Sequence, residues 1–252
     1  MPVSATFVPP QEILPLRDLY RKEMNCQIIH DSWHGRAWLD CYLLRRDKRI
    51  VGYGCVGDVR ARRKDMITEF YVLPAHRGRA LPLFRSFIEA SKARRIVLQT
   101  NDILLTLMAY DCATRLKSDT ILFQDCLTTN LSVPGAAFVR ATEADAKRIF
   151  AHKVEPVGDW LIKVGAKIVA TGGILFHYNV PYGDIYMEVA KPFRRRGYGS
   201  YLIQELKRVC YEMGRVPAAR CGASNVASRA TLQKAGMLPC ARVLNGVIAA
   251  GK

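Results

Sequence analysis

The segment Arg194-Arg195-Arg196-Gly197-Tyr198-Gly199 has the composition of a loop that binds phosphate groups. It follows residues 184–190, which alternate like a strand, and it precedes residues 199–213, which have helical periodicity. The unpaired N–H groups and the dipole of a helix N-terminus favour an anion at such a position. The two glycines let the backbone approach a phosphate closely, and Ser200 adds a hydroxyl donor. The pattern predicts a pyrophosphate site, with a basic loop that only caps the helix as the alternative.

The elements that position this loop belong to a weak internal repeat. Residues 41–56 and 160–175 both alternate apolar and polar positions around a central break, which predicts two β-hairpins. Four pairs of residues keep a similar spacing along the chain: Ile50 and Ile168 are 118 apart, Val72 and Val189 are 117 apart, Arg77 and Arg194 are 117 apart, and Asn101 and Asn225 are 124 apart. A repeat of this length predicts two structurally similar units.

We therefore expect an α/β fold made of two tandem units, each a mixed, mostly antiparallel sheet flanked by helices. The polar stretch 128–135 serves as the linker, which gives domains at residues 1–130 and 136–252. Expected in the second unit are strands at 137–140, 184–190 and 218–222, helices from 142, 199–213 and 227–235, the hairpin, and a closing strand pair turning at Asn245-Gly246.

The composition narrows the class of protein. Hydrophobic residues make up 50% of the chain, which is the usage of a folded protein and not of a disordered one. No apolar run reaches the roughly 18 residues needed to span a bilayer, and the start lacks a signal peptide pattern, so we expect a cytoplasmic protein without a membrane partner. The eight cysteines form no C-x-x-C pair and are expected to be reduced. The net charge of +16 favours polyanionic partners, including phosphorylated cofactors.

Residues 139 to the C-terminus resemble the GNAT (GCN5-related) superfamily of N-acetyltransferases. The resemblance includes the family signature R/Q-x-x-G-x-G/A at Arg194 to Gly199. It also includes a later segment led by Asn225 that runs through Lys234-Ala-Gly-Met237. The whole chain then resembles a tandem member of the family whose N-terminal unit is degenerate.

The resemblance implies that acetyl-CoA is the cofactor and acyl donor. Backbone groups of Met187 and Val189 would pair with the pantetheine arm like an added strand. Asn225 and Ser228 would contact the pantetheine and phosphate side, although Asn225 capping the helix and Ser228 packing are the simpler alternatives. The pyrophosphate would be held by Arg194, Arg195, Arg196, Gly197, Tyr198, Gly199 and Ser200.

Glu188 is the candidate catalytic residue. Acetyl transfer to an amine needs a general base that removes a proton from the ammonium, and the family often places such a base at the position of Glu188. A solvent-facing strand residue and a binding group for a cationic acceptor are the alternatives for Glu188. The usual general acid of the family is a tyrosine seven residues after the asparagine, and Leu232 stands there instead.

The first unit resembles a degraded copy of the second. In the register of Val72 and Val189, the two signature glycines become Ala80 and Pro82, and proline removes an N–H donor. The position of Glu188 is taken by Tyr71. His30 and His34 are four residues apart, but the glutamate that accompanies such a pair in zinc-binding motifs is absent. We therefore predict that both histidines pack in the structure and that they form no metal site.

The leading hypothesis is an N-acetyltransferase that transfers an acetyl group from acetyl-CoA to a primary amine, with a catalytic C-terminal unit. The acceptor is not encoded in a motif, and a homodimer is left open. The leading hypothesis involves no nucleic acid. The alternative is a non-catalytic CoA-binding or nucleic-acid-associated module, motivated by Leu232 and by the charge of +16.

Overall fold

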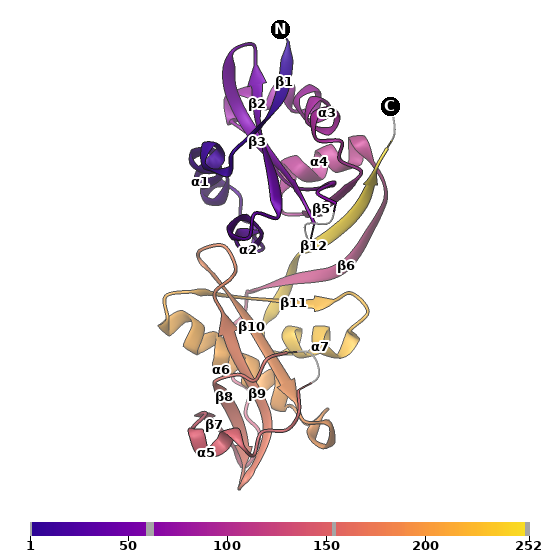
Figure 1. The fold of residues 1–252 in the computed structure, drawn as a ribbon. Helices are drawn as coiled ribbons and strands as arrows, with labels where there is room; N and C mark the ends of the chain where they lie inside the picture. The colour runs from indigo at the N-terminus through magenta and orange to yellow at the C-terminus, as the bar shows by residue number, and fades with distance from the viewer. Residues whose placement is uncertain (1, 59–62, 153–154, 250–252) are drawn as a thin grey trace. The chain divides into compact units, whose positions relative to one another are not determined.

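The computed structural model describes residues 2–58, 63–152 and 155–249. The contacts divide the chain into two compact units, which are considered separately (Figure 1). The first unit comprises Met1–Thr120 with Ala241–Lys252, and the second comprises Ile121–Cys240. None of the helices in the described ranges is both long and apolar enough to cross a membrane.

The first unit begins with a strand and alternates hairpins with helices. Its elements are β1 (Val3–Val8), η1 (Pro10–Ile13), α1 (Leu14–Glu23), α2 (Asp31–Gly35), β2 (Leu39–Arg46), β3 (Arg49–Gly57), β4 (Met66–Val72), η2 (Pro74–Arg79), α3 (Ala80–Ser91), β5 (Arg95–Gln99), α4 (Ile103–Cys112) and the start of β6 (Ala113–Asp125).

The second unit repeats this order with fewer helical residues before its hairpin. Its elements are β7 (Ala136–Arg140), α5 (Glu143–Ala146), β8 (Trp160–Val164), β9 (Lys167–Leu175), β10 (Tyr182–Val189), η3 (Lys191–Phe193), α6 (Tyr198–Glu212), β11 (Val216–Gly222), α7 (Val226–Lys234) and the start of β12 (Met237–Ile248).

Both units contain a mixed sheet that is mostly antiparallel. In the first, β1 to β4 are antiparallel neighbours, β4 pairs with β5 in parallel, and β12 runs antiparallel to β5. In the second, β7 to β10 are antiparallel neighbours, and β10 pairs with β11 in parallel. The expected fold class is therefore confirmed.

The hairpin turns also match between the units. Asp47 and Gly165, which are 118 residues apart, both adopt a left-handed backbone, with φ of 56° and 54°. This conformation lets a two-residue connection follow the twist of its strands. The repeat inferred from sequence spacing therefore extends to the backbone torsions.

Each face of the first sheet has its own core because side chains alternate along a strand. Phe70 and Val72 of β4 pack with α3 and α4. Tyr53 and Tyr71 point to the opposite face and pack with Tyr20 of α1. Glu69 has the same parity as Tyr71 and lies on the α1 face.

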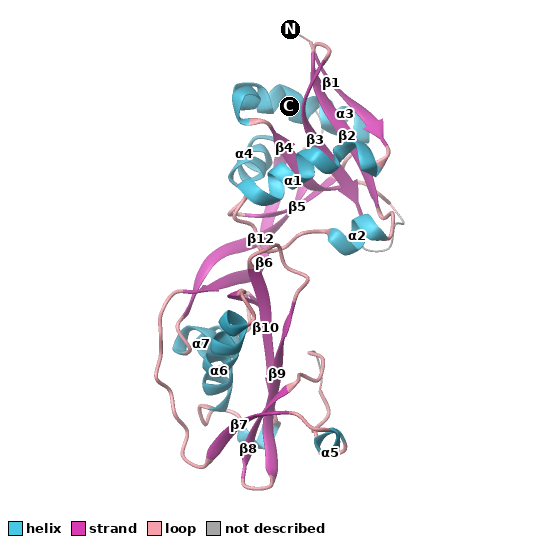
Figure 2. Ribbon diagram, turned by 90° about the vertical axis from the view of Figure 1, so that its left-hand side faces the viewer, coloured by secondary structure: helices cyan, strands magenta, loops and turns pink. Residues whose placement is uncertain are grey.

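The second unit buries one face of its sheet under α6 and α7 (Figure 2). Ile185 and Met187 of β10 pack on this face with Leu202 and Leu206 of α6. Glu188 alternates with these residues and points to the other face. In the described part of residues 136–159, α5 is the only helix, so this second face has much less helical cover than its counterpart in the first unit.

The C-terminal segment differs from expectation in two ways. Residues 241–252 group with the first unit, whereas the expected second domain extends to residue 252. The expected turn at Asn245-Gly246 is wrong, because β12 continues through both residues and pairs them with Val97 and Ile96 of β5. A side chain at Gly246 would lie 2.6 Å from Leu116 of β6, so this glycine allows close strand packing and not a turn.

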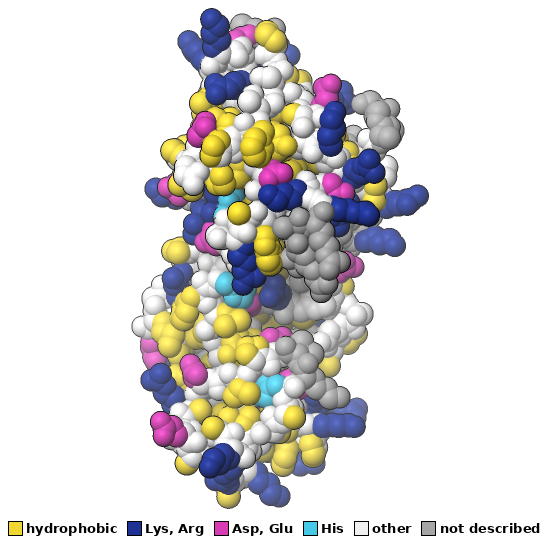
Figure 3. All heavy atoms as spheres, in the orientation of Figure 1, with side chains coloured by type: hydrophobic (Ala, Val, Ile, Leu, Met, Phe, Trp, Pro, Cys, Tyr) yellow, Lys and Arg dark blue, Asp and Glu magenta, His cyan; other side chains and the backbone are white. Residues whose placement is uncertain are grey.

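The positive charge is dispersed on the face drawn in Figure 3. Lys and Arg side chains are interspersed there with Asp, Glu and hydrophobic side chains and do not form one continuous patch. A nucleic-acid-binding surface usually presents a basic stripe or patch on one face. Among the side chains drawn in colour in Figure 3, the basic ones do not line up as one such stripe.

Candidate cofactor loop and catalytic site

The site in the second unit lies where two parallel strands separate. β10 and β11 pair only at Tyr182, Gly183 and Asp184, and β10 then continues to Val189 (Figure 1). The Ala190 N–H donates to the Val169 carbonyl of β9. Because antiparallel hydrogen bonding alternates, the backbone groups of residues 186 and 188 also face β9. Those of Met187 and Val189 face the side of β11, where an extended ligand would add as a strand.

The loop after β10 is shaped to present N–H groups. Arg195 and Gly197 adopt left-handed φ values of 60° and 89°. Gly197 is the N-cap of α6 and provides no side-chain cap, and the Tyr201 N–H is the first to bond within the helix, to the Gly197 carbonyl. The N–H groups of residues 198–200 therefore have no partner within the helix. Alternating backbone conformations before such a helix form an anion-binding concavity.

Arg194 anchors the loop to the end of β10. Its Nε donates to the Val189 carbonyl at 3.0 Å, and its guanidinium lies 3.7 Å from a Glu188 carboxylate oxygen. Arg77 repeats the first contact in the other unit, where its Nε donates to the Val72 carbonyl at 3.1 Å. The matching arginines thus hold equivalent strand ends. Arg195 and Arg196, which are exposed like Arg194, are the other two cations of the loop.

Glu188 lies beside a histidine that sequence reasoning did not select. The Nδ1 atom of His152 is 3.8 Å from a Glu188 carboxylate oxygen. The same atom lies 3.1 Å from the Glu155 carbonyl, and Nε2 lies 2.8 Å from the Thr171 hydroxyl. Since a carbonyl only accepts, Nδ1 carries a proton, and in the neutral imidazole Nε2 then accepts from the Thr171 hydroxyl. Thr171 is the register partner of Glu188 on β9, so the strand pairing positions the histidine next to the carboxylate.

Further carboxylates gather near Glu188. Burial raises the pKa of Glu155, and the negative charges of Asp184 and Glu188 raise it further. Asp184 is itself buried, with His177 at 3.2 Å and Arg220 at 3.8 Å. Clustered carboxylates favour a bound cation, so this region suits a positively charged amine.

The helix after β11 has an ordinary cap. The Asn225 side chain accepts the Ser228 N–H at 3.0 Å and so caps α7. This supports the simpler alternative for Asn225, while cofactor contacts from Asn225 and Ser228 stay a prediction. Leu232 and Tyr198 are both buried in the core against α6 and the sheet. The ring of Tyr198 therefore serves the core, and its backbone N–H is the group that this residue offers to a phosphate at the loop.

The corresponding loop in the first unit has a different conformation. Residues 74–79 form the 3-10 helix η2, and none of the residues from 73 to 91 has a left-handed φ. Pro82 stands in the first turn of α3, where its ring removes one of the N–H groups that an anion would bind. The tyrosine at the Glu188 position, Tyr71, donates to Glu23 at 2.7 Å.

A chain segment also occupies the space between β4 and β5. These strands pair only at Met66 and Ile67, as β10 and β11 do at their start. The backbone of Ile28 exchanges two hydrogen bonds with the Gln99 side chain, at 2.9 Å and 2.7 Å. The cavity that remains between residues 28–30 and the two strands measures about 30 Å³. Residues 28–30 therefore take up part of the position that a pantetheine arm would need between these strands.

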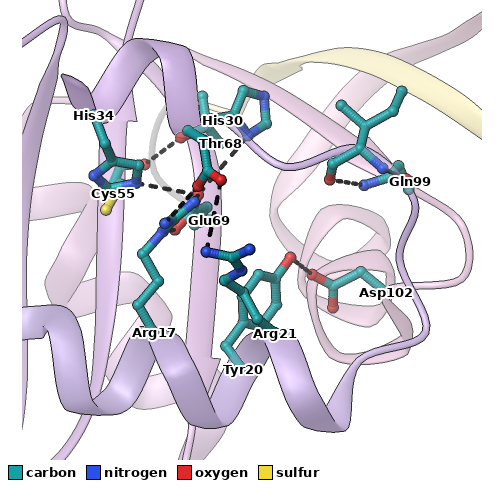
Figure 4. A network of polar contacts seen from close by, with 12 residues as sticks. Arg17, Tyr20, Arg21, His30, His34, Cys55, Thr68, Glu69, Gln99 and Asp102 are labelled. Carbon is teal, nitrogen blue, oxygen red and sulfur yellow. Dashed lines mark hydrogen bonds and ion pairs between the residues drawn. The ribbon is translucent and has the colours of Figure 1, made fainter. Parts of the chain in front are cut away.

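Asp102, and not Asn101, caps the helix that follows β5. Its side chain accepts the Leu105 N–H at 3.0 Å and the Tyr20 hydroxyl at 3.0 Å (Figure 4). Asn101 instead donates to the Asn25 carbonyl, which fastens the segment before Ile28. Burial raises the pKa of Asp102 to about 6.

Asp102 therefore makes a specific contribution to the pH dependence of stability. The pKa of Asp102 is higher in the folded than in the unfolded protein, so at pH values between these two pKa values the folded protein binds more protons. Lowering the pH through 6 therefore stabilises the fold. We expect the wild type to gain about 1 kcal/mol relative to Asp102→Asn between pH 7 and pH 5. Urea unfolding of both proteins at the two pH values measures this difference. An unchanged difference would show that Asp102 is ionised normally.

Comparison with known proteins agrees with this architecture. The family model described as "Acetyltransferase (GNAT) domain" matches residues 11–126, and the model described as "Acetyltransferase (GNAT) family" matches residues 126–237. Together they cover most of the chain, which therefore belongs to the GNAT acetyltransferase family as a tandem member. No curated protein matches the sequence.

Solved structures share the fold at low sequence identity. A GNAT-family acetyltransferase from Colwellia psychrerythraea is 14% identical with a TM-score of 0.72, over 98% of this chain and 100% of that one. A tandem GNAT protein from the clavulanic acid biosynthesis pathway, solved without AcCoA, is 12% identical with a TM-score of 0.59, over 100% and 99%. A GCN5-related N-acetyltransferase from Sphaerobacter thermophilus is 17% identical with a TM-score of 0.55, over 99% and 97%. These identities support the shared fold alone.

Proposed function

We propose that the C-terminal unit binds acetyl-CoA and transfers its acetyl group to a primary amine. The observation that carries this proposal is the loop at 194–199, whose left-handed residues turn the N–H groups of α6 outward beside the diverging end of β10. The pyrophosphate would bind the N–H groups of residues 198–200 and the side chains of Arg195 and Arg196. The backbone of Met187 and Val189 would pair with the pantetheine arm.

Glu188 is proposed as the general base. It accepts a proton from the ammonium group of the acceptor, and the neutral amine nitrogen then attacks the thioester carbonyl carbon. A carbon–nitrogen bond forms, the carbon–sulfur bond breaks, and the sulfur leaves as the CoA thiolate. His152 and Arg194 flank the carboxylate and hold it in place. Glu155 and Asp184 add negative charge that attracts a cationic acceptor.

The leucine at position 232 favours a second candidate function, in which the unit binds CoA without catalysing acetyl transfer. The leucine is buried and offers no proton to the departing thiolate, so protonation has to come from another residue or from water. Release of free thiol from acetyl-CoA, measured across a panel of primary amines with binding measured in parallel, separates the two functions. Turnover that depends on the amine supports the enzyme. Tight binding without thiol release from any amine would favour the module.

The binding measurement also tests which unit is competent. We expect one acetyl-CoA per chain, because the first unit lacks the loop conformation and its strand gap is partly filled. Two bound molecules per chain would contradict this assignment.

A further inference from the structure

A cluster of metal-ligating side chains lies in the first unit, on the α1 face of its sheet. Cys41 of β2 and Cys55 of β3 are direct register partners, and both are fully buried. Their sulfur atoms are 3.7 Å apart. A disulfide would require about 2.05 Å. Two thiolates bound to one tetrahedral zinc ion, each at about 2.3 Å, lie about 3.8 Å apart.

Two further donors, from α2 and β4, lie beside Cys55. His34 Nε2 is 3.2 Å from Glu69 Oε1, close to the roughly 3.3 Å between nitrogen and oxygen ligands of tetrahedral zinc. The ligand atoms of His34, Cys55 and Glu69 all lie within 4.8 Å of one another. Cys41 lies just outside this set of three: its sulfur is 3.7 Å from that of Cys55 but not within 4.8 Å of all three ligand atoms, so its side chain has to turn toward them to act as the fourth donor. Figure 4 shows His34, Cys55 and Glu69 converging from α2, β3 and β4.

The surrounding groups orient the carboxylate as a ligand. Glu69 Oε2 accepts from the Tyr53 hydroxyl at 2.9 Å and from Arg17 Nε at 3.1 Å, while Oε1 faces His34 and also lies 3.2 Å from an Arg17 nitrogen. Arg17 also contacts Asp31 at 2.8 Å, at the start of the helix that carries His34. Hydrogen bonds of this kind fix the direction of metal ligands.

The charges balance when a divalent ion is present. Two thiolates and one carboxylate carry three negative charges, which a divalent cation and the Arg17 guanidinium neutralise. Sulfur and imidazole donors favour zinc over magnesium or calcium, which prefer oxygen. The geometry points to a structural zinc site formed by His34, Cys41, Cys55 and Glu69 in the first unit, and we propose it as a site independent of acetyl transfer. Four protein ligands leave no open position, which is typical of a structural ion.

This inference revises the expectation of no metal that rested on His30 and His34. Those two histidines do not act as a pair, because His34 Nε2 lies 3.2 Å from Glu69 whereas His30 Nδ1 lies 3.9 Å from it. The partners of His34 come from strands distant in sequence. A zinc ion would join α2 to the central strands and stabilise the unit, because metal binding adds to folding free energy.

The experiment measures metal in the full-length protein without a histidine tag. We expect about one zinc per chain by inductively coupled plasma mass spectrometry after purification under reducing conditions. Replacing the zinc with Co²⁺ should give the visible absorption of a tetrahedral ion and a thiolate charge-transfer band. Both readings use the wild type and do not require any variant to fold.

Variants then assign the ligands. Cys41→Ser and Cys55→Ser should each weaken zinc binding at least tenfold in competition with a chromophoric chelator. The matched control is Cys112→Ser, which removes a buried free thiol of the same unit outside the cluster and should retain the wild-type affinity. Absence of zinc together with absence of a cobalt–thiolate band would overturn the proposal. So would a Cys41–Cys55 disulfide in the reduced preparation, or equal effects of all three substitutions. None of these outcomes bears on acetyl transfer.

Discussion

Glu188→Gln should lower kcat/KM for the amine about 10²- to 10⁴-fold and leave the Kd for acetyl-CoA unchanged. Glutamine keeps the size and polarity of the side chain but cannot accept the proton of the ammonium group, and general base catalysis contributes about this much. Glu188 lies on the sheet face opposite Met187 and α6, so the substitution leaves the helix packing of the unit intact. Steady-state kinetics of thiol release, with binding by calorimetry, give both quantities.

The matched control for this substitution is Glu212→Gln, at an exposed glutamate near the end of α6. It makes the same chemical change away from the site and should leave both constants as they are. Rate loss in Glu188→Gln that disappears at high pH, where the amine is already neutral, would strengthen the role of base. A variant with wild-type kcat/KM at neutral pH would remove Glu188 from the mechanism.

Arg196→Glu should raise the Kd for acetyl-CoA about 10- to 100-fold. A charge-assisted hydrogen bond to a phosphate contributes about 1.5 to 3 kcal/mol, and the reversed charge adds repulsion. Arg196 is exposed and lies over the Phe193 ring, so its replacement has little effect on the core. The effect should shrink as salt increases, because exposed charges are screened.

The other unit supplies a matched control for this prediction. Arg79 stands at the position of Arg196, 117 residues earlier, and is also exposed. Arg79→Glu changes the net charge by the same amount and should alter the Kd less than twofold. Equal losses in the two variants would mean that acetyl-CoA responds to the overall charge of the protein and not to the loop at 194–199.

Local backbone features were predictable from the sequence because they depend on residues close together in the chain. Glycine at 197 and the strand before it predict a left-handed turn into a helix, and the structure has that turn. Arg77 and Arg194 have the same spacing as Val72 and Val189, which predicts that the two arginines occupy equivalent positions in the two units. In the structure, each arginine donates to the backbone carbonyl five residues earlier. Alternation along strands likewise predicts which side chains are buried.

Features that depend on which strand pairs with which were not predictable in this way. Asn245-Gly246 has the composition of a hairpin turn. In the structure, however, both residues pair with β5, so β12 continues through them as a strand. His152 carries no local signal and reaches Glu188 only because Thr171 faces that residue across β9 and β10.

The sequence by itself determined the family, the tandem repeat and the loop at 194–199, since each rests on residue types at short or regular spacing. Tertiary structure alone decided how the gap in the first sheet is filled and which side chains surround Glu188. It also brought Cys41, Cys55 and Glu69 together beside His34, although these residues are spread over 36 positions of the chain. The physical reason is that strand register sets distances between residues far apart in sequence, and register is a property of the whole sheet.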